Sequence, residues 1–148
     1  MNIGDKAPNF EGKDQNGETI KLSDFQGKKV VLYFYPKDNT PGCTAQSCNL
    51  RDNYELLLEN GYVVLGVSSD NEKSHQKFIT KFELPFPLIA DTEKEIHHLF
   101  GTWQEKNTFG KTYMGTVRTT FVIDENGVIA DIIKKVNTKE HTAQIITN

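Results

Sequence analysis

The residues of this sequence whose types could do redox chemistry are its two cysteines, Cys43 and Cys48. Free cysteines are often no more than small core hydrophobes, and that is the first interpretation of such a pair. In a reducing compartment, two thiols that form no structural disulfide can instead carry out chemistry. The spacing of the two residues decides little by itself. The residues around them have to separate the two interpretations.

Cys43 lies where a helix is expected to begin. Thr40 and Pro41 are typical of an N-cap and of the first helical position, which places Cys43 in the first turn. The amides of a helix start lack partners within the helix and present partial positive charge, which favours a thiolate. A reactive cysteine needs this help, because an ordinary thiol is mostly protonated at neutral pH.

Three further residues could act on this thiol. Thr40 can turn its hydroxyl toward the sulfur, and Pro36 ends the preceding strand and helps to exclude water. A lone Arg is more often a surface ion-pair partner, but Arg118 stands at the entry to a buried strand, which favours a functional role. Cys43 is expected to face the sheet, because it shares a helical stripe with Leu50, Tyr54 and Leu57.

The elements that position these residues begin with strands and a helix. Asn16-Gly17 predicts the turn of an N-terminal hairpin. The apolar run from Val30 to Tyr35 suits a central strand that is covered on both faces. One helix then runs from Pro41 to the stop signal Asn60-Gly61 and leads into a second strand, Val63–Val67. Residues 30–67 therefore form a βαβ unit.

The rest of the chain alternates in the same way. We expect a helix after the capping-box pattern Ser69-x-x-Glu72, a short helix from Asp91 to Phe100, an irregular stretch over 101–116, a hairpin of Thr120–Ile123 with Val128–Ile133, and a last helix near Thr138. The predicted fold class is α/β: a thioredoxin-like fold with a mixed central sheet, helices on both faces and an N-terminal hairpin extension. The chain contains no repeat and no linker, so we predict a single domain, 1–148.

Composition and charge exclude several function classes. The 17 Lys and Arg against 20 Asp and Glu give a formal charge of -3, and no basic run suggests a nucleic-acid partner. No apolar stretch approaches the roughly 20 residues that a membrane span needs. The start of the chain does not resemble a signal peptide. We expect a cytoplasmic protein without a membrane or nucleic-acid partner.

The segment from Phe34 to Thr44 resembles the signature of the peroxiredoxins, in which Pro36, Thr40 and Cys43 stand at the family's spacing. The second cysteine, five positions later, resembles the Q-type branch, also called the bacterioferritin comigratory proteins. Similar blocks cover nearly the whole chain: Gly4-Asp5-Lys6-Ala7-Pro8-x-Phe10, Gly61-x-Val63-Val64-Leu65-Gly66-Val67-Ser68, Lys111-Thr112-Tyr113-Met114-Gly115 and Arg118-Thr119-Thr120-Phe121-Val122-Ile123-Asp124.

This resemblance implies a thiol peroxidase with a residue-by-residue assignment of roles. Cys43 would attack the peroxide oxygen and become a sulfenic acid, and Cys48 would resolve it as a disulfide. Thr40 and Arg118 would hold the hydroperoxide, and Pro36 would shield the pocket. Thioredoxin or a similar dithiol protein would re-reduce a monomeric enzyme that needs no cofactor. The family usually has Glu three residues after the first cysteine, whereas this chain has Gln46.

Two other functions remain open on the same fold. A general thiol–disulfide oxidoreductase normally uses Cys-x-x-Cys at the helix start, and a copper carrier uses Cys-x-x-x-Cys with a distant His. We expect no metal site, because the four histidines are scattered: His75, His97, His98 and His141. The neighbours His97 and His98 are expected on a polar helix face. Trp103 and the stretch 109–114 could dock a partner, but packing is the favoured interpretation.

Overall fold

The computed structural model describes residues 1–146 of the 148-residue chain. Its strands are β1 (Glu11–Lys13), β2 (Thr19–Lys21), β3 (Lys29–Phe34), β4 (Tyr62–Ser68), β5 (Leu88–Ala90), β6 (Trp103–Thr108), β7 (Lys111–Thr116), β8 (Thr119–Ile123) and β9 (Ile129–Ile133). Its helices are the 3-10 turn η1 (Leu22–Phe25), α1 (Pro41–Asp52), α2 (Tyr54–Glu59), α3 (Glu72–Phe82), α4 (Glu95–Phe100) and α5 (His141–Ile145).

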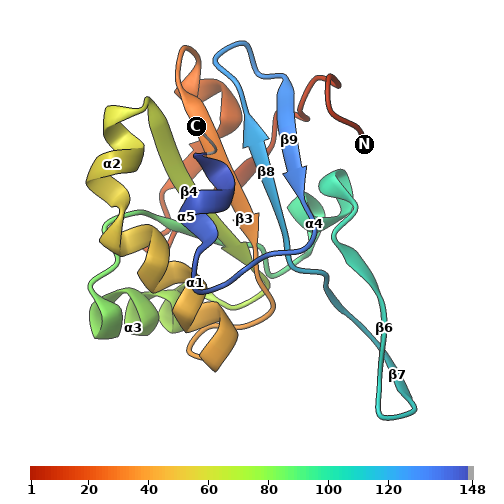
Figure 1. Cartoon of the computed structure of the whole chain (residues 1–148). Coiled ribbons are helices and arrows are strands. Elements are labelled where there is room, and N and C mark those ends of the chain that lie inside the picture. Colours follow the sequence, from red (N-terminus) through yellow and green to blue (C-terminus); the bar gives the residue numbers. More distant parts are fainter. Residues whose placement is uncertain (147–148) are drawn as a thin grey trace.

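A five-stranded mixed sheet forms the centre of the fold, with the strand order β5-β4-β3-β8-β9. The central strand β3 pairs in parallel with β4 and antiparallel with β8 (Figure 1). At the two edges of the sheet, β5 is parallel to β4 and β9 is antiparallel to β8. The predicted mixed sheet is confirmed. The separate β1–β2 ribbon confirms the N-terminal hairpin, with Gly17 in its turn at φ 76°.

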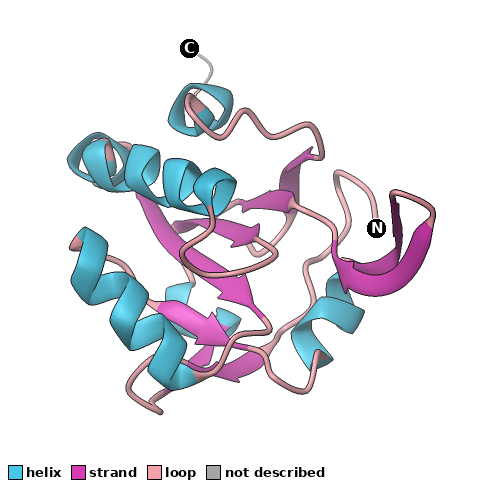
Figure 2. Ribbon diagram, turned by 90° about the horizontal axis from the view of Figure 1, so that it is seen from below, coloured by secondary structure: helices cyan, strands magenta, loops and turns pink. Residues whose placement is uncertain are grey.

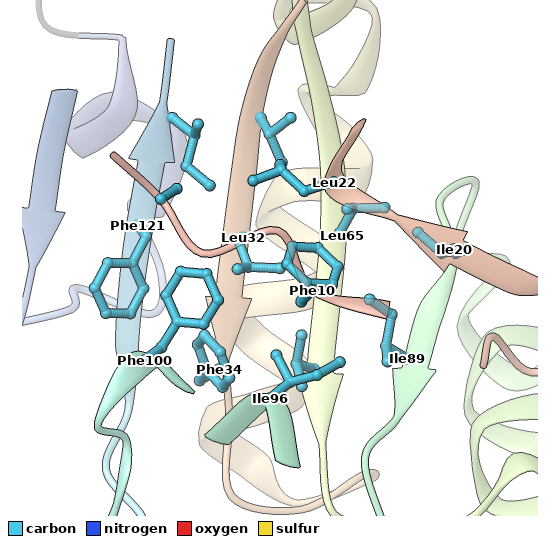
Figure 3. Close-up of a cluster of buried hydrophobic side chains, with 14 of the residues drawn as sticks. Phe10, Ile20, Leu22, Leu32, Phe34, Leu65, Ile89, Ile96, Phe100 and Phe121 are labelled. Carbon is cyan, nitrogen blue, oxygen red and sulfur yellow. The ribbon is translucent and has the colours of Figure 1, made fainter. Parts of the chain in front are cut away.

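Both faces of the sheet are covered, as predicted (Figure 2). Successive residues of a strand point to opposite faces, so the apolar run of β3 feeds two cores. Val31 and Tyr33 pack with buried residues of α1, α2, α3 and α5. Leu32 and Phe34 pack on the other face, in a cluster that Figure 3 shows together with Phe10 of the N-terminal segment and residues of α4.

The long helix predicted to begin at Pro41 and to carry Cys43 is divided into α1 and α2. The break falls at Asn53, whose side-chain amide donates to the carbonyl of Asn49 at 2.8 Å. Asn side chains compete in this way with the backbone bonds of a helix. Both pieces still present their apolar stripe to the sheet, with Leu50 and Leu57 fully buried.

The stretch 101–116 is not irregular, contrary to expectation. It contains the antiparallel ribbon of β6 and β7, which extends away from the body of the molecule (Figure 1). Phe109 and Gly110 connect the strands with positive φ at both positions, 52° and 78°. A two-residue turn of this kind normally carries Asn or Asp before Gly. The turn was therefore not predicted, because Phe109 stands where Asn or Asp is usual.

Smaller differences concern where elements begin. Strand β5 was not expected, because its three residues are too few to show a pattern. The N-cap of α3 is Asn71, whose side chain accepts from the amide of Ser74 at 2.8 Å, and not Ser69. Helix α4 begins at Glu95 and α5 at His141, each later than predicted. Within residues 1–146, none of the helices has the length and apolar character that a membrane crossing requires.

Candidate active site

Cys43 occupies the first turn of α1, as the sequence predicts. Its side chain is only 1% exposed and packs in the core that contains Leu50 and Leu57, so it faces the sheet. Thr40 stands at the N-cap position, and its carbonyl accepts from the amide of Thr44. The sulfur therefore lies near the positive end of a helix of 12 residues, where a thiolate is favoured.

Arg118 lies immediately before β8, the strand next to β3, and its side chain reaches the sulfur of Cys43. It precedes Thr119, which pairs with Phe34 at the end of β3. Helix α1 follows that same end of β3. The pairing of β3 with β8 therefore places the Arg118 guanidinium close to the start of α1. Nη2 donates to Sγ of Cys43 at 3.1 Å, and Nη1 donates to Oε1 of Gln46 at 2.5 Å. The structure thus brings together two predicted residues that are 75 positions apart in the chain.

Gly42 makes room for this approach. A Cβ at position 42 would lie 3.3 Å from Nη2 of Arg118, closer than most Cβ contacts allow. A side chain at position 42 would therefore require the guanidinium to shift by a few tenths of an ångström. This role could not be predicted, because a glycine before a cysteine carries no pattern of its own.

Thr40 and Pro36 lie in the loop between β3 and α1. The Thr40 hydroxyl donates to the carbonyl of Lys37 at 2.9 Å and does not cap the helix amides. Its proton is used in this bond, so the lone pairs of its oxygen are available to accept. Pro36 is half-buried and follows Tyr35 directly. Both residues are thus placed at the entrance to α1, as predicted.

Cys48 lies further along the same helix, half-buried, and both cysteines are free. Burial raises the pKa of the Cys48 thiol, an effect that the charge of Arg51 opposes and that of Asp52 strengthens. Five residues along a helix separate two Cα atoms by roughly 8 to 9 Å, whereas a disulfide tolerates about 7 Å at most. Cys43 and Cys48 therefore cannot bond to each other while α1 is intact.

A buried polar cluster anchors the loop that leads to Cys43. The carboxylate of Asp38 accepts from the hydroxyls of Tyr35 at 2.6 Å and Ser74 at 2.8 Å, and pairs with Nδ1 of His75 at 2.7 Å. The backbone amide of Asp38 donates to Asp70 at 2.8 Å. The loop is thus tied to α3 and to the end of β4.

This cluster could not be predicted from local patterns, because Asp70, Ser74 and His75 lie 32 to 37 positions from Asp38. Asp38, Asp70 and His75 each place a potential ligand atom within 4.8 Å of the others. These atoms hydrogen-bond within the cluster, and the bonds account for the geometry. We assign it a structural role in holding the loop.

His97 and His98 were both expected on a polar helix face. This prediction is wrong for His97, which is buried, and is confirmed for His98, which is exposed. Nδ1 of His97 pairs with Asp91 at 2.6 Å, and Nε2 pairs with the hydroxyl of Thr116 at 2.8 Å. Burial alone would raise the pKa of Asp91, but hydrogen bonds from His97 and from neighbouring amides outweigh it and lower the pKa. This bridge joins α4 to β7, shortly before Arg118.

His141 of α5 lies on the same side of the sheet as Cys43. Its Nδ1 contacts Oε1 of Gln144 at 2.9 Å, and its Nε2 contacts the hydroxyl of Thr120 at 2.8 Å. An amide oxygen only accepts, so Nδ1 carries the proton and Nε2 accepts from Thr120. Burial lowers the pKa of His141, the bond to Gln144 opposes this, and the charge of Arg118 lowers the pKa further. The ring of His141 is therefore neutral at neutral pH.

The aromatic residues of the β6–β7 region differ in burial. Trp103 is half-buried and its ring meets that of His97 edge-on, with centroids 5.6 Å apart. Phe109 is fully exposed at the turn, and Tyr113 and Met114 are about half exposed. Packing is therefore confirmed for Trp103 and wrong for the other three, because the ribbon stands away from the sheet (Figure 1).

Known proteins that are similar to this chain indicate its family. The chain matches the model of the AhpC/TSA family over residues 3–132. It is 47% identical over 146 residues to peroxiredoxin Bcp of Bacillus subtilis (strain 168), which covers 99% of this chain and 93% of the relative. It is 44% identical over 141 residues to peroxiredoxin Bcp of Escherichia coli (strain K12), which covers 95% of this chain and 90% of the relative.

Solved structures give the same result. A crystal structure of a PrxQ mutant from Xylella fastidiosa is similar with a TM-score of 0.92 and 31% identity, over 99% of this chain and 94% of that one. Peroxidoxin BcpB from Mycobacterium tuberculosis is similar with a TM-score of 0.88 and 32% identity, over 99% and 95%. The chain belongs to the AhpC/TSA family and is a peroxiredoxin of the Bcp or Q type, a peroxidase on a thioredoxin-like fold.

Proposed function

We propose that Cys43 is the residue of this peroxidase that reduces hydroperoxides. Its thiolate attacks the outer oxygen of ROOH, so that an S–O bond forms as the O–O bond breaks. The sulfur is oxidised by two electrons to a sulfenic acid, and the leaving oxygen takes up a proton to give an alcohol or water. The observation that carries this proposal is the 3.1 Å contact from Nη2 of Arg118 to the buried sulfur.

Arg118 and Thr40 then have complementary roles. The guanidinium favours the thiolate and stabilises the negative charge that develops on the departing oxygen. The Thr40 hydroxyl, which donates to Lys37, offers its lone pairs to the proton of the hydroperoxide. Pro36 covers the loop beside them and limits the access of water. Together these groups orient the peroxide for attack by Cys43.

Cys48 resolves the sulfenic acid. Its sulfur attacks the sulfur of Cys43, an S–S bond forms, and hydroxide leaves and is protonated to water. The helical separation of the two residues requires that α1 first unwinds around Cys48. Its raised pKa suits this order of events, because Cys48 stays a thiol and does not compete for peroxide while the helix is folded.

The disulfide is re-reduced by a dithiol protein of the thioredoxin type. Such a reductant supplies the two electrons, and its own cysteines become the disulfide. We also propose that the enzyme acts as a monomer, because Thr40, Cys43, Cys48 and Arg118 all come from one chain. Its proposed location is the cytoplasm. Sedimentation of the reduced protein tests the monomer: a stable dimer would contradict it.

A coupled assay tests the proposed cycle. NADPH oxidation is followed with thioredoxin and thioredoxin reductase, with and without hydrogen peroxide or an organic hydroperoxide. We expect peroxide-dependent turnover that Cys43→Ser abolishes, whereas Cys48→Ser consumes about one equivalent of peroxide and stops as the sulfenic acid. A Cys48→Ser protein that forms no trappable sulfenic acid would reverse the two assignments. Reduction of insulin without peroxide would instead support a general oxidoreductase.

A further inference from the structure

His75 of α3 is fully buried, and both of its ring nitrogens face atoms that accept hydrogen bonds. Nε2 lies 3.0 Å from the carbonyl oxygen of Ile89, and Nδ1 lies 2.7 Å from Oδ2 of Asp38. A carbonyl oxygen only accepts, so Nε2 carries a hydrogen. The carboxylate of Asp38 also accepts from the hydroxyls of Tyr35 and Ser74, and these bonds stabilise its negative charge. Nδ1 must then donate as well, which makes His75 an imidazolium.

The other histidines of the chain do not need two protons. Nε2 of His97 and Nε2 of His141 each face a threonine hydroxyl, which can donate as well as accept. One proton on the ring therefore satisfies each of them. His98 is exposed and can exchange its hydrogen bonds with water. The geometry thus separates His75 from the rest.

The charges that face His75 also favour an imidazolium. Asp38 in the loop after β3 and Asp70 after β4 place carboxylate oxygens within 4.8 Å of the ring. Tyr35 at the end of β3 is neutral, because burial raises the pKa of its phenol well above the ordinary value. Strand β5 contributes the carbonyl of Ile89, which carries no charge. Two negative groups and a carbonyl dipole therefore surround the ring, and a positive charge on the ring offsets them.

The loop that Asp38 belongs to carries two residues of the proposed site. Asp38 stands midway between Pro36 and Thr40, its side chain is 3% exposed, and its amide donates to Asp70. The next residue, Asn39, has a positive φ of 60°, a left-handed conformation that is uncommon outside glycine. Such a conformation persists where the surroundings hold it in place. The shape of the loop therefore depends on how Asp38 is held.

We propose that His75 is a positioning residue, whose imidazolium holds Asp38 and thereby fixes the loop that presents Thr40 to the peroxide. The positive ring satisfies the buried carboxylate, and the carboxylate keeps the loop bent at Asn39. Loss of the Nδ1 proton would turn a lone pair toward the carboxylate and release the loop. This inference rests on the proposed role of Thr40. It assigns control of the reaction rate to a side chain that does not touch the peroxide.

Nitrogen NMR of the histidine rings tests the protonation state without peroxide and without a change in the active site. At pH 7.5 we expect hydrogens on both ring nitrogens of His75, with the chemical shifts of an imidazolium. The exposed His98 is the internal reference for a ring that titrates freely. A substitution at His75 identifies its signals by their loss. A His75 ring with only one protonated nitrogen would overturn the inference, whether or not the proposed catalytic cycle is right.

Two substitutions separate the two hydrogen bonds of the ring. His75→Gln can keep the bond to Ile89, but it removes the charge and the donor from Asp38. His75→Asn can keep a donor to Asp38. In a single turnover with hydrogen peroxide, His75→Gln should be slower than the wild type by about tenfold or more, since a loosened group loses its orientation. His75→Asn should recover part of this loss.

His98→Gln is the matched control on an exposed histidine, and it should react at the wild-type rate. Thermal unfolding shows which variants are folded. Ser74→Ala is the milder variant should His75→Gln fail to fold. It removes one hydroxyl from Asp38 and should lower the rate by a smaller factor. A wild-type rate in folded His75→Gln, or in Ser74→Ala where the first variant is unfolded, would overturn the positioning role.

A double-mutant cycle shows whether the effect passes through Thr40. Thr40→Val removes the hydroxyl that His75 is proposed to position. In that background His75→Gln should have little further effect on the rate, because residues that act through one another are not additive. Additive losses would overturn the inference. A Thr40→Val protein as fast as the wild type would instead overturn the role of Thr40 in the proposed function.

Discussion

The two thiols of this chain differ in their surroundings, although one helix carries both. Cys43 is fully buried at the helix start and receives a hydrogen bond from Arg118. Cys48 is half-buried in the middle of the helix, and burial raises its pKa. A positive charge and a helix N-terminus favour a thiolate, and burial without them disfavours it. Position within α1 therefore separates the proposed attacking thiol from the proposed resolving thiol.

Arg118→Ala should slow the reaction with peroxide far more than it destabilises the fold. The loss of one charged donor at a reacting centre typically costs about 10²- to 10³-fold in rate. Stability should fall by less, about 1 to 3 kcal/mol, because Arg118 is half-buried and the buried Oε1 of Gln46 loses its donor. Stopped-flow rate constants and thermal unfolding measure the two effects. An unchanged rate constant would remove Arg118 from the mechanism.

Arg118→Lys is the companion variant. A lysine keeps the charge but cannot contact Cys43 and Gln46 at once with two fixed arms. We expect a rate between those of the wild type and Arg118→Ala. A lysine variant as fast as the wild type would mean that charge alone is sufficient.

His141 makes part of the stability depend on pH. Burial lowers its pKa in the folded state below the ordinary value of about 6.5. Between these two pKa values the unfolded chain binds more protons, so the contribution is complete above about pH 6.5 and is lost as the pH falls toward the folded value. Urea unfolding from pH 8 to pH 5 should show a smaller pH-dependent loss in His141→Gln than in the wild type. Equal slopes would contradict the assignment.

Helix α1 has to break its contacts with three neighbours before the cysteines can meet. Ser47 hydrogen-bonds to the hydroxyl of Tyr33 at 2.9 Å, and Arg51 donates to the carbonyl of Phe82 at 2.8 Å. Asn49 binds the segment before α5 and the start of α5, through the carbonyl of Lys139, the amide of Thr142 and the hydroxyl of Thr142. Unwinding α1 therefore also releases α5.

Amide hydrogen exchange tests this coupling. On oxidation to the Cys43–Cys48 disulfide, we expect exchange to accelerate at residues 44–52 and also at residues 139–146, because Asn49 joins them. Local unfolding of this kind leaves the sheet protected. The β3 and β4 amides serve as the internal control. Equal protection of residues 44–52 in both redox states would rule out the unwinding.

At the scale of the whole molecule, we propose that residues 1–148 form one domain. The sheet is shared by both cores, since alternate residues of β3 enter each of them. Neither face can be exposed without disrupting the other. We expect denaturant unfolding to be two-state, with coincident transitions by far-UV circular dichroism and by the fluorescence of Trp103. An earlier fluorescence transition would show that the β6–β7 region unfolds by itself.

The features that depend on neighbouring residues could be predicted from the amino-acid sequence. The apolar run of β3, the Thr40-Pro41 start of α1 and the N-terminal turn all act over a few positions, and each was predicted in its place. The same local reasoning put Cys43 at a helix start facing the core. Predictions from local patterns were wrong where one residue is unusual for its position. Phe109 occupies the β6–β7 turn, and Asn53 interrupts the predicted helix between α1 and α2.

Which distant groups meet depends on the three-dimensional packing of the chain. The antiparallel register of β3 and β8 sets Arg118 beside Cys43, and the packing of α3 sets His75 against Asp38. Both the register and the packing are global solutions that bury two apolar faces at once, so no short stretch of chain encodes them. The family signature named Arg118 in advance. The neutral partner that holds it, Gln46, and the space left for it by Gly42 became visible only in three dimensions.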